Sequence, residues 1–235
     1  MRWKFILGLL TTCAVLMSMS YTMLIPFLPM YLIQDLGVVK ADVDMWSGAI
    51  FAITFLVSGI MAPIWGALAD KKSRKLMALR AGFCLAITYF LGGLVTNPWE
   101  LLGVRFIQGL SAGLWPALLA IISVESPKLK LGFCMGVMQG GMTAGGVLGP
   151  LFGGLLADQF GMRMAFFIAA AALFLITLAL LFFVKEEPRK PDPNAKPVKI
   201  WDFSLCKIPA VKRMLICAGV VQLLSLIHIS EPTRH

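Results

Sequence analysis

The chain is divided into long apolar stretches that are separated by short charged segments. Six stretches are complete, each about as long as the roughly 20 residues with which an α-helix crosses a bilayer core of about 30 Å. The sequence therefore predicts an all-α polytopic membrane protein, and with 59% hydrophobic and only 14% charged residues it excludes a soluble domain. The stretches lie near 5–28, 46–69, 76–96, 99–123, 132–157 and 164–184, and a seventh begins near Ile208.

The positive charges are concentrated on alternate sides of these stretches. If the amino terminus is cytoplasmic, 17 of the 21 Lys and Arg residues fall on the inside, and only Lys40 and Arg163 fall outside. Cytoplasmic loops carry the excess of Lys and Arg, so we expect a multi-pass protein of a bacterial cytoplasmic membrane with a cytoplasmic amino terminus. The net charge of +9 is thus an orientation signal and does not indicate nucleic-acid binding.

The charged segments divide the chain into four parts. Residues 1–184 form the expected six-helix bundle, and the Pro-rich segment 185–209 is the expected cytoplasmic linker to a second bundle. Residues 210–223 begin the seventh helix. The last part, 224–235, matches a reading frame of a sequencing-library adapter, so we expect the native chain to continue differently from this point.

Two helix ends repeat each other. PIWGALAD at 63–70 and PLFGGLLAD at 150–158 keep the order Pro, aromatic, Gly, Leu, Ala, Asp, and they end the second and the fifth stretch. These stretches are the middle helices of two three-helix units that cross the membrane in opposite directions. Such inverted repeats are typical of secondary transporters.

The loop after the second stretch reads GALADKKSRK at 66–75. With the motifs described below it resembles the major facilitator superfamily, and within it the twelve-helix drug–proton antiporters that act in multidrug efflux. The resemblance implies that Gly66, Asp70, Arg74 and Glu125 form a conformational latch at the inner ends of the helices. Ser73 stands where the motif usually has glycine.

The stretch LLGVRFIQG at 101–109 resembles the fourth-helix motif of this superfamily, which places an arginine inside the membrane. Burying Arg105 costs about 2.5–3.5 kcal/mol, so it should face the bundle interior or a water-filled cavity. The resemblance implies a role in proton coupling. No complete stretch holds a deep acidic residue, which leaves Asp35 and Glu100 at the outer ends, or a carboxylate of a second bundle, as proton carriers.

The fifth stretch fits the antiporter motif of the family at every glycine and proline position. Small residues every four positions allow another helix to approach closely, and proline permits a bend. The resemblance implies a smooth helix that rocks against its neighbours. The motif residues are Gly136, Gly145, Gly149, Pro150, Gly153 and Gly154.

Large apolar side chains suit a cavity for varied lipophilic ligands because Met and aromatic residues adapt to different shapes. The resemblance of the Pro-rich end of the first stretch to drug antiporters places part of this lining there. The candidates are Pro26, Phe27, Met30, Tyr31, Phe55, Gln108, Trp115, Met138 and Met142.

The sequence holds no Walker loop, no metal-ligand cluster and no nucleophile–base pair, so we expect neither an enzyme nor a bound cofactor or metal. The expected function is proton-coupled efflux of lipophilic small molecules by alternating access, with protons, lipid and a second six-helix bundle as partners. The alternatives are a metabolite or sugar-phosphate carrier of the same superfamily and, from another class, a membrane receptor or scaffold.

Overall fold

The computed structural model of the chain describes residues 2–71, 73–184, 213 and 217. The chain forms two compact units, Met1–Ala195 and Lys196–His235. Only two positions of the second unit are described, so the fold is that of the first. The predicted linker 185–209, seventh helix 210–223 and adapter-like tail 224–235 otherwise lie outside the described residues.

All regular elements of the described residues are helices, in agreement with the predicted all-α class. The α-helices are α1 (Arg2–Met23), α2 (Leu28–Gln34), α3 (Val43–Lys71), α4 (Arg74–Leu94), α5 (Pro98–Leu110), α6 (Leu114–Glu125), α7 (Leu131–Phe160) and α8 (Met162–Phe183). Two single-turn 3₁₀-helices are η1 (Lys40–Asp42) and η2 (Lys128–Lys130).

Six helical segments of the described residues are long and apolar enough to cross a membrane, which confirms the prediction of six spans. Two spans differ from the uninterrupted helices that the sequence predicted. The first ends at Met23 and is followed, after four residues, by the short helix α2. The fourth is broken between α5 and α6 at residues 111–113. Hydropathy does not detect either break, because the residues around them remain apolar.

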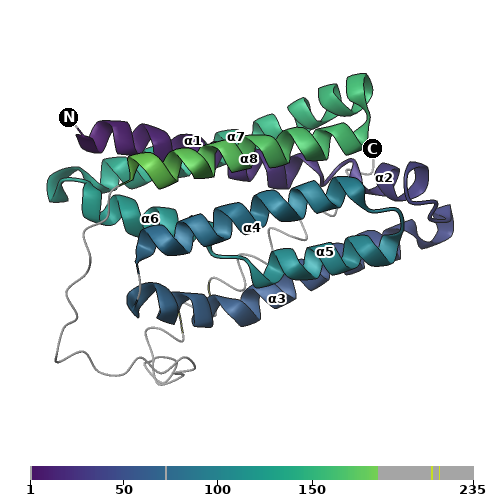
Figure 1. Cartoon of the computed structure of the whole chain (residues 1–235), viewed down its shortest axis with the longest axis horizontal. Helices are drawn as coiled ribbons and strands as arrows, with labels where there is room; N and C mark the ends of the chain where they lie inside the picture. Colours follow the sequence, from purple (N-terminus) through teal and green to yellow (C-terminus); the bar gives the residue numbers. More distant parts are fainter. Residues whose placement is uncertain (1, 72, 185–212, 214–216, 218–235) are drawn as a thin grey trace. The chain divides into compact units, whose positions relative to one another are not determined.

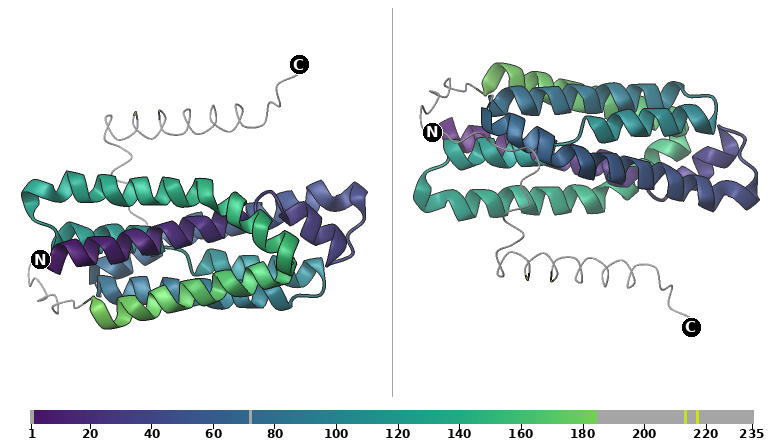
Figure 2. Two further views of the ribbon diagram at one scale, coloured as in Figure 1. Left: turned by 90° about the horizontal axis from the view of Figure 1, so that it is seen from above. Right: turned by 90° about the horizontal axis from the view of Figure 1, so that it is seen from below.

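The helices pair across the two predicted three-helix units. The first span (α1) packs mainly on the fifth (α7), the second (α3) on the fourth (α5), and the third (α4) on the sixth (α8). Exchanging the two three-helix units converts the first two pairings into each other and the third into itself, which is the pattern an inverted repeat produces. Figure 1 shows α1, α7 and α8 on one side of α4 and the α3–α5 pair on the other, and Figure 2 shows the same helices from two further directions.

Helix α4 is the centre of the bundle. Of its membrane-spanning window 61% is buried, against 17% for the windows of α3 and α7. Two tyrosines connect α4 to α1 and α2: the hydroxyl of Tyr89 on α4 donates to the carbonyl of Ser20 on α1 at 2.7 Å, and that of Tyr31 on α2 donates to the carbonyl of Gly92 on α4 at 2.9 Å. The exposed apolar faces of α3 and α7 are left for lipid or for other helices.

The glycines of the fifth span are packed against α1. A Cβ atom at Gly145 would overlap the carbonyl oxygen of Val15, and one at Gly149 would overlap the hydroxyl of Thr22. A Cβ at Gly153 would lie 2.8 Å from that of Met23. Three of the motif glycines therefore allow α1 and α7 to approach with backbone against backbone, as the glycine spacing predicted.

The remaining motif positions lie on other parts of α7. A Cβ at Gly154 would lie 3.2 Å from the ring of Phe27, whereas one at Gly136 would meet no atom within 4 Å. Pro150 lies inside α7, where its missing N–H leaves one backbone carbonyl without its usual helical donor. Gly136 is thus not needed for the packing of α1 on α7.

We expect Gly145→Ala to destabilise the bundle by about 1–3 kcal/mol, because the added methyl group must displace the α1 backbone. Gly140→Ala is the matched control on the same helix, since a Cβ at Gly140 meets no atom within 4 Å. The measurement is thermal unfolding of the purified protein in detergent. Equal unfolding temperatures for the two variants would contradict the close packing of α1 on α7.

Candidate functional site

A cavity of ≈ 650 Å³ opens within the six-span bundle of residues 2–184. Side chains of α1, α3, α4, α5 and α7 line it, together with residues 111–116 at the break between α5 and α6. Its apolar lining consists of Met17, Ile25, Phe51, Phe55, Ala62, Ala81, Leu85, Gly109, Ala112, Gly113, Leu114, Trp115, Pro116 and Met142. Its polar lining includes Ser18, Tyr21, Thr22, Thr54, Ser58, Arg105, Gln108 and Ser111. A largely apolar wall with a few convergent polar groups is typical of a small-molecule site.

Arg105 is the charged residue of this lining, as the sequence predicted for a cation inside the membrane. Its side chain is only 5% exposed, and its Nη1 donates to Oε1 of Gln108, one helical turn later on α5, at 3.0 Å. Thr54 of α3 donates to the carbonyl of Arg105 at 3.3 Å and thereby ties α3 to this turn.

Two donors of this pair have no partner among the described residues. Nη2 of Arg105 and Nε2 of Gln108 are buried and donate to no protein acceptor within hydrogen-bond distance and angle. Both residues line the cavity. Leaving a buried donor unsatisfied costs about 1–3 kcal/mol, and more for a charged group, so the pair is suited to bind an acceptor that enters the cavity.

Four of the predicted lining residues do line the cavity: Phe55, Gln108, Trp115 and Met142. The other five lie outside its lining. Tyr31 and Met138 are fully buried in the core, Met30 is 42% exposed, Pro26 is exposed beside α2, and Phe27 packs against Gly154.

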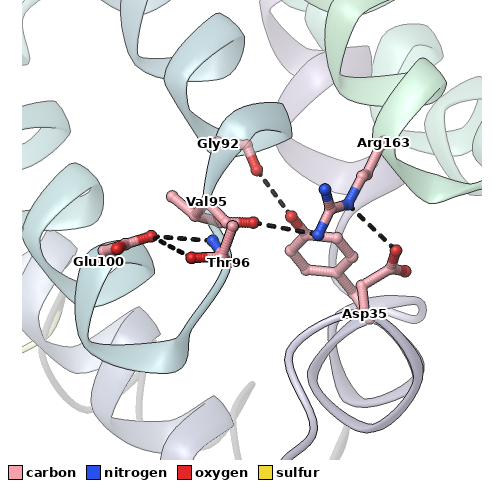
Figure 3. Close-up of polar contacts among 7 residues, drawn as sticks. Asp35, Gly92, Val95, Thr96, Glu100 and Arg163 are labelled. Carbon is pink, nitrogen blue, oxygen red and sulfur yellow. Dashed lines mark hydrogen bonds and ion pairs between the residues drawn. The ribbon is translucent and has the colours of Figure 1, made fainter.

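Asp35 lies outside the cavity lining and pairs with an arginine of α8. Its Oδ1 accepts from Nε of Arg163 at 3.2 Å, and Nη2 of Arg163 donates to the carbonyl of Val95 at 3.3 Å. Figure 3 shows this cluster beside the hydrogen bond from Tyr31 to Gly92. The ends of α2, α4 and α8 are therefore connected through one guanidinium group.

Glu100, the other acidic residue that the sequence offered as a proton carrier, lies in the first turn of α5 and helps to cap it. Its carboxylate accepts from the backbone N–H of Thr96 at 2.8 Å (Figure 3). Its own N–H donates to the side chain of Asn97 at 2.9 Å. This reciprocal arrangement satisfies two backbone donors at a helix start.

The four residues of the predicted latch lie at or near helix ends, and the structure describes three of them in full. Gly66 is exposed near the end of α3, Arg74 begins α4, and Glu125 ends α6. The side chain of Asp70 lies outside the described residues. Ser73, in the usual glycine position, has φ −67° and caps α4 by accepting from the N–H of Leu76 at 3.1 Å. The serine therefore needs no left-handed backbone.

Sequence reasoning missed a second arginine inside a span. It grouped Arg80 with the inner cations, but Arg80 lies six residues into α4, almost two turns from its start. Its guanidinium lies 3.4 Å from the ring centre of Trp65 on α3. The signal was present in the position of Arg80 within the apolar stretch 76–96; its contact with Trp65 was not readable from spacing.

Residues 10–229 match the family model described as Major Facilitator Superfamily, and the chain belongs to this family. Among its relatives is the multidrug resistance protein MdtG of Citrobacter koseri, which is 42% identical over 186 residues. The protein of the same name from Yersinia enterocolitica is 40% identical over 187 residues. Each match covers 79% of this chain but only 46% and 45% of the respective relative. The chain thus spans less than half the length of these relatives.

Solved transporter structures share the fold. A bacterial homologue of the human lysosomal transporter Spinster, in an inward-facing and unoccupied conformation, matches with a TM-score of 0.69 at 22% identity over 88% of this chain and 48% of its own. The POT family transporter PepTSo matches with a TM-score of 0.67 at 14% identity over 80% of this chain and 40% of its own. These structures show the shared fold, whereas the family match and the relatives confirm the resemblance to the superfamily and to its multidrug proteins.

We expect a double-mutant cycle to reveal the pairing of Arg105 with Gln108. Gln108→Leu leaves the buried guanidinium without its acceptor, whereas Arg105→Leu combined with Gln108→Leu removes both partners, which is far less costly. The coupling free energy should be about 1.5–3 kcal/mol, the range for hydrogen bonds to charged groups. It is measured by unfolding of the four proteins in detergent, and strictly additive effects would contradict the pairing.

Proposed function

We propose that this chain forms the amino-terminal half of a proton-coupled exporter of lipophilic small molecules. The observation that carries the proposal is the largely apolar cavity whose wall contains one buried cation with an unpartnered donor. Relatives named multidrug resistance proteins support export as the direction of transport. In this proposal the amino terminus is cytoplasmic, in a bacterial cytoplasmic membrane, as the distribution of Lys and Arg favours.

The mechanism that fits this half is alternating access around the cavity. A second bundle covers the open side, and the two halves rock so that the cavity opens to one side of the membrane at a time. The segment 185–209 connects the halves in this scheme, and 210–223 begins the second one. The glycine surface of α7 against α1 keeps this half rigid while it moves, because close backbone packing leaves little room for rearrangement.

Arg105 is the proposed coupling residue within the cavity. The described lining contains no carboxylate, so the proton carrier in this scheme is Asp35 at the end of α2, Glu100 in the first turn of α5, or an acidic residue of the second bundle. A fixed positive charge lowers the pKa of a nearby carboxylate. Approach of a carboxylate to Arg105 would therefore release a proton, and its departure would take one up.

The latch residues complete the proposed cycle. Gly66, Asp70, Arg74 and Glu125 hold the expected cytoplasmic ends of the helices in one of the two states. A few hydrogen-bonded ion pairs suit such a switch because they can break and re-form with each cycle.

A metabolite or sugar-phosphate carrier is the second candidate, favoured by the same unpartnered donors. Nη2 of Arg105 and Nε2 of Gln108 would bind a carboxylate or phosphate oxygen directly. In that case transport would depend on an anionic group of the substrate and would be inhibited by small organic anions.

We expect the complete transporter to expel a lipophilic dye such as ethidium from cells or vesicles, driven by the proton gradient. Arg105→Ala should abolish this efflux with membrane expression unchanged, because coupling is lost while the remaining packing stays. Phe106→Ala, at an exposed neighbour on the same helix, is the matched control. Efflux that persists in Arg105→Ala contradicts its role, and absence of any gradient-driven transport by the complete protein favours a receptor or scaffold.

Asp35→Asn tests the first of these proton carriers. If Asp35 carries the proton, the substitution should abolish efflux, whereas an ion pair that is only structural should leave efflux nearly intact. Its side chain and that of Arg163 are 27% and 42% exposed, and such pairs contribute about 0–1 kcal/mol to stability. Arg163→Gln, which removes the same pair but keeps the carboxylate, is the control. Efflux in Asp35→Asn equal to that of the parent excludes Asp35, and equal efflux in Glu100→Gln as well would assign the proton to the second bundle.

A further inference from the structure

The break in the fourth span forms one wall of the cavity. Helix α5 ends at Leu110 and α6 begins at Leu114, and all six residues from Ser111 to Pro116 line the cavity. The shape of this segment, including the placement of Trp115, therefore determines part of the volume that a ligand meets.

The local sequence explains why the helix cannot continue through this segment. In an unbroken helix the carbonyl of Ala112 would accept from the N–H of residue 116, but residue 116 is proline, which has no N–H and whose ring clashes with that carbonyl. Gly113 adopts φ +114°, a conformation that favours glycine. The carbonyls of Leu110 and Ala112 are among those that consequently lose their backbone donors.

Two side chains from other helices satisfy these carbonyls. Nε1 of Trp65 on α3 donates to the carbonyl of Leu110 at 2.8 Å, and Nη2 of Arg80 on α4 donates to the carbonyl of Ala112 at 3.0 Å. The Arg80 guanidinium also stacks on the Trp65 ring, 3.4 Å from its centre. An unsatisfied carbonyl costs several kcal/mol in hydrocarbon, so the broken segment depends on both donors.

Arg80 makes no other hydrogen bond or ion pair among the described residues. It forms no ion pair with a described carboxylate, and its Nε is buried without a partner. A cation within a span is costly unless its neighbours compensate for the lost water. A planar guanidinium can donate to a carbonyl and stack on an indole at once, which a lysine ammonium cannot do with the same geometry.

We propose that Arg80 and Trp65 are positioning residues that hold the segment Ser111–Pro116 in the shape that lines the cavity, and that they thereby set which ligands the cavity accepts. The second half of this statement rests on the proposed function of the cavity, whereas the first half does not. Neither side chain lines the cavity itself, so both act through the backbone of the segment.

The first test is the reactivity of a cysteine at position 111 in the purified full chain. Ser111→Cys is introduced into a variant whose native cysteines are replaced, and its labelling by N-ethylmaleimide is followed. Adding Arg80→Gln should raise the labelling rate about tenfold, the factor expected when one hydrogen bond from a charged donor is lost and the segment opens more often. Arg80→Lys should give a smaller rise because it retains a donor.

Matched controls separate positioning from general loss of stability. Ser58→Cys, on the α3 wall of the same cavity, should label at an unchanged rate. Arg163→Gln removes another arginine that donates to a backbone carbonyl, and it should leave labelling at 111 unchanged. Trp65→Phe keeps the stacked ring but loses the N–H, and it supplies a milder variant if Arg80→Gln does not fold. Unchanged labelling at 111, or an equal rise at 58, would overturn the proposal.

The second test is ligand selection, measured with tetraphenylphosphonium and the bulkier dye rhodamine 6G. Arg80→Gln should change the ratio of their two dissociation constants severalfold, whereas a purely structural role would weaken both equally. A constant ratio together with altered labelling would overturn the part that concerns selection. If the parent protein binds neither probe while labelling changes as expected, the proposed function fails and the positioning role stands.

Discussion

The satisfaction of backbone hydrogen bonds in hydrocarbon is the constraint on which this fold depends. Continuous helices meet it by themselves, and most of the described chain consists of such helices. Where the fourth span leaves helical geometry, its free carbonyls receive donors from two other helices, through Trp65 and Arg80. The irregular backbone lines a cavity, which is the environment in which membrane proteins tolerate it.

Close contact between helices is the second requirement, and it is met in different ways at the main interfaces. Helix α7 presents glycines to the backbone of α1. Where α4 packs on α8, glycines of α4 make room for larger side chains of α8. Gly92 lies against the ring of Phe166, and Gly82 lies against Thr177. In lipid, where apolar side chains gain little by leaving the solvent for one another, such fitted contacts provide much of the attraction between helices.

The sequence predicted the features that depend on one helix at a time. The number of spans, the buried position of Arg105 and the packing role of the α7 glycines follow from length, hydropathy and spacing. It could not predict which Met and Phe residues face the cavity, because helices in lipid are apolar on all sides and their orientation has no signal in the pattern. The pairing of Asp35 with Arg163, 128 residues apart, equally required the three-dimensional arrangement. The break at 111–113 was readable in principle from Gly113 and Pro116, but only by following each backbone donor.

The pairing of helices across the two units has a consequence for synthesis. Helix α1 ends at Met23, while its main partner α7 begins only at Leu131. At ribosomal speeds of about 5–20 residues per second, synthesis of α1 is complete on the order of 10 s before synthesis of α7 begins. During that time the α1 surface opposite the future glycines must be held by lipid or by the insertion machinery. The unit of folding for this bundle is therefore the whole set of six spans and not the three-helix repeat from which it is built.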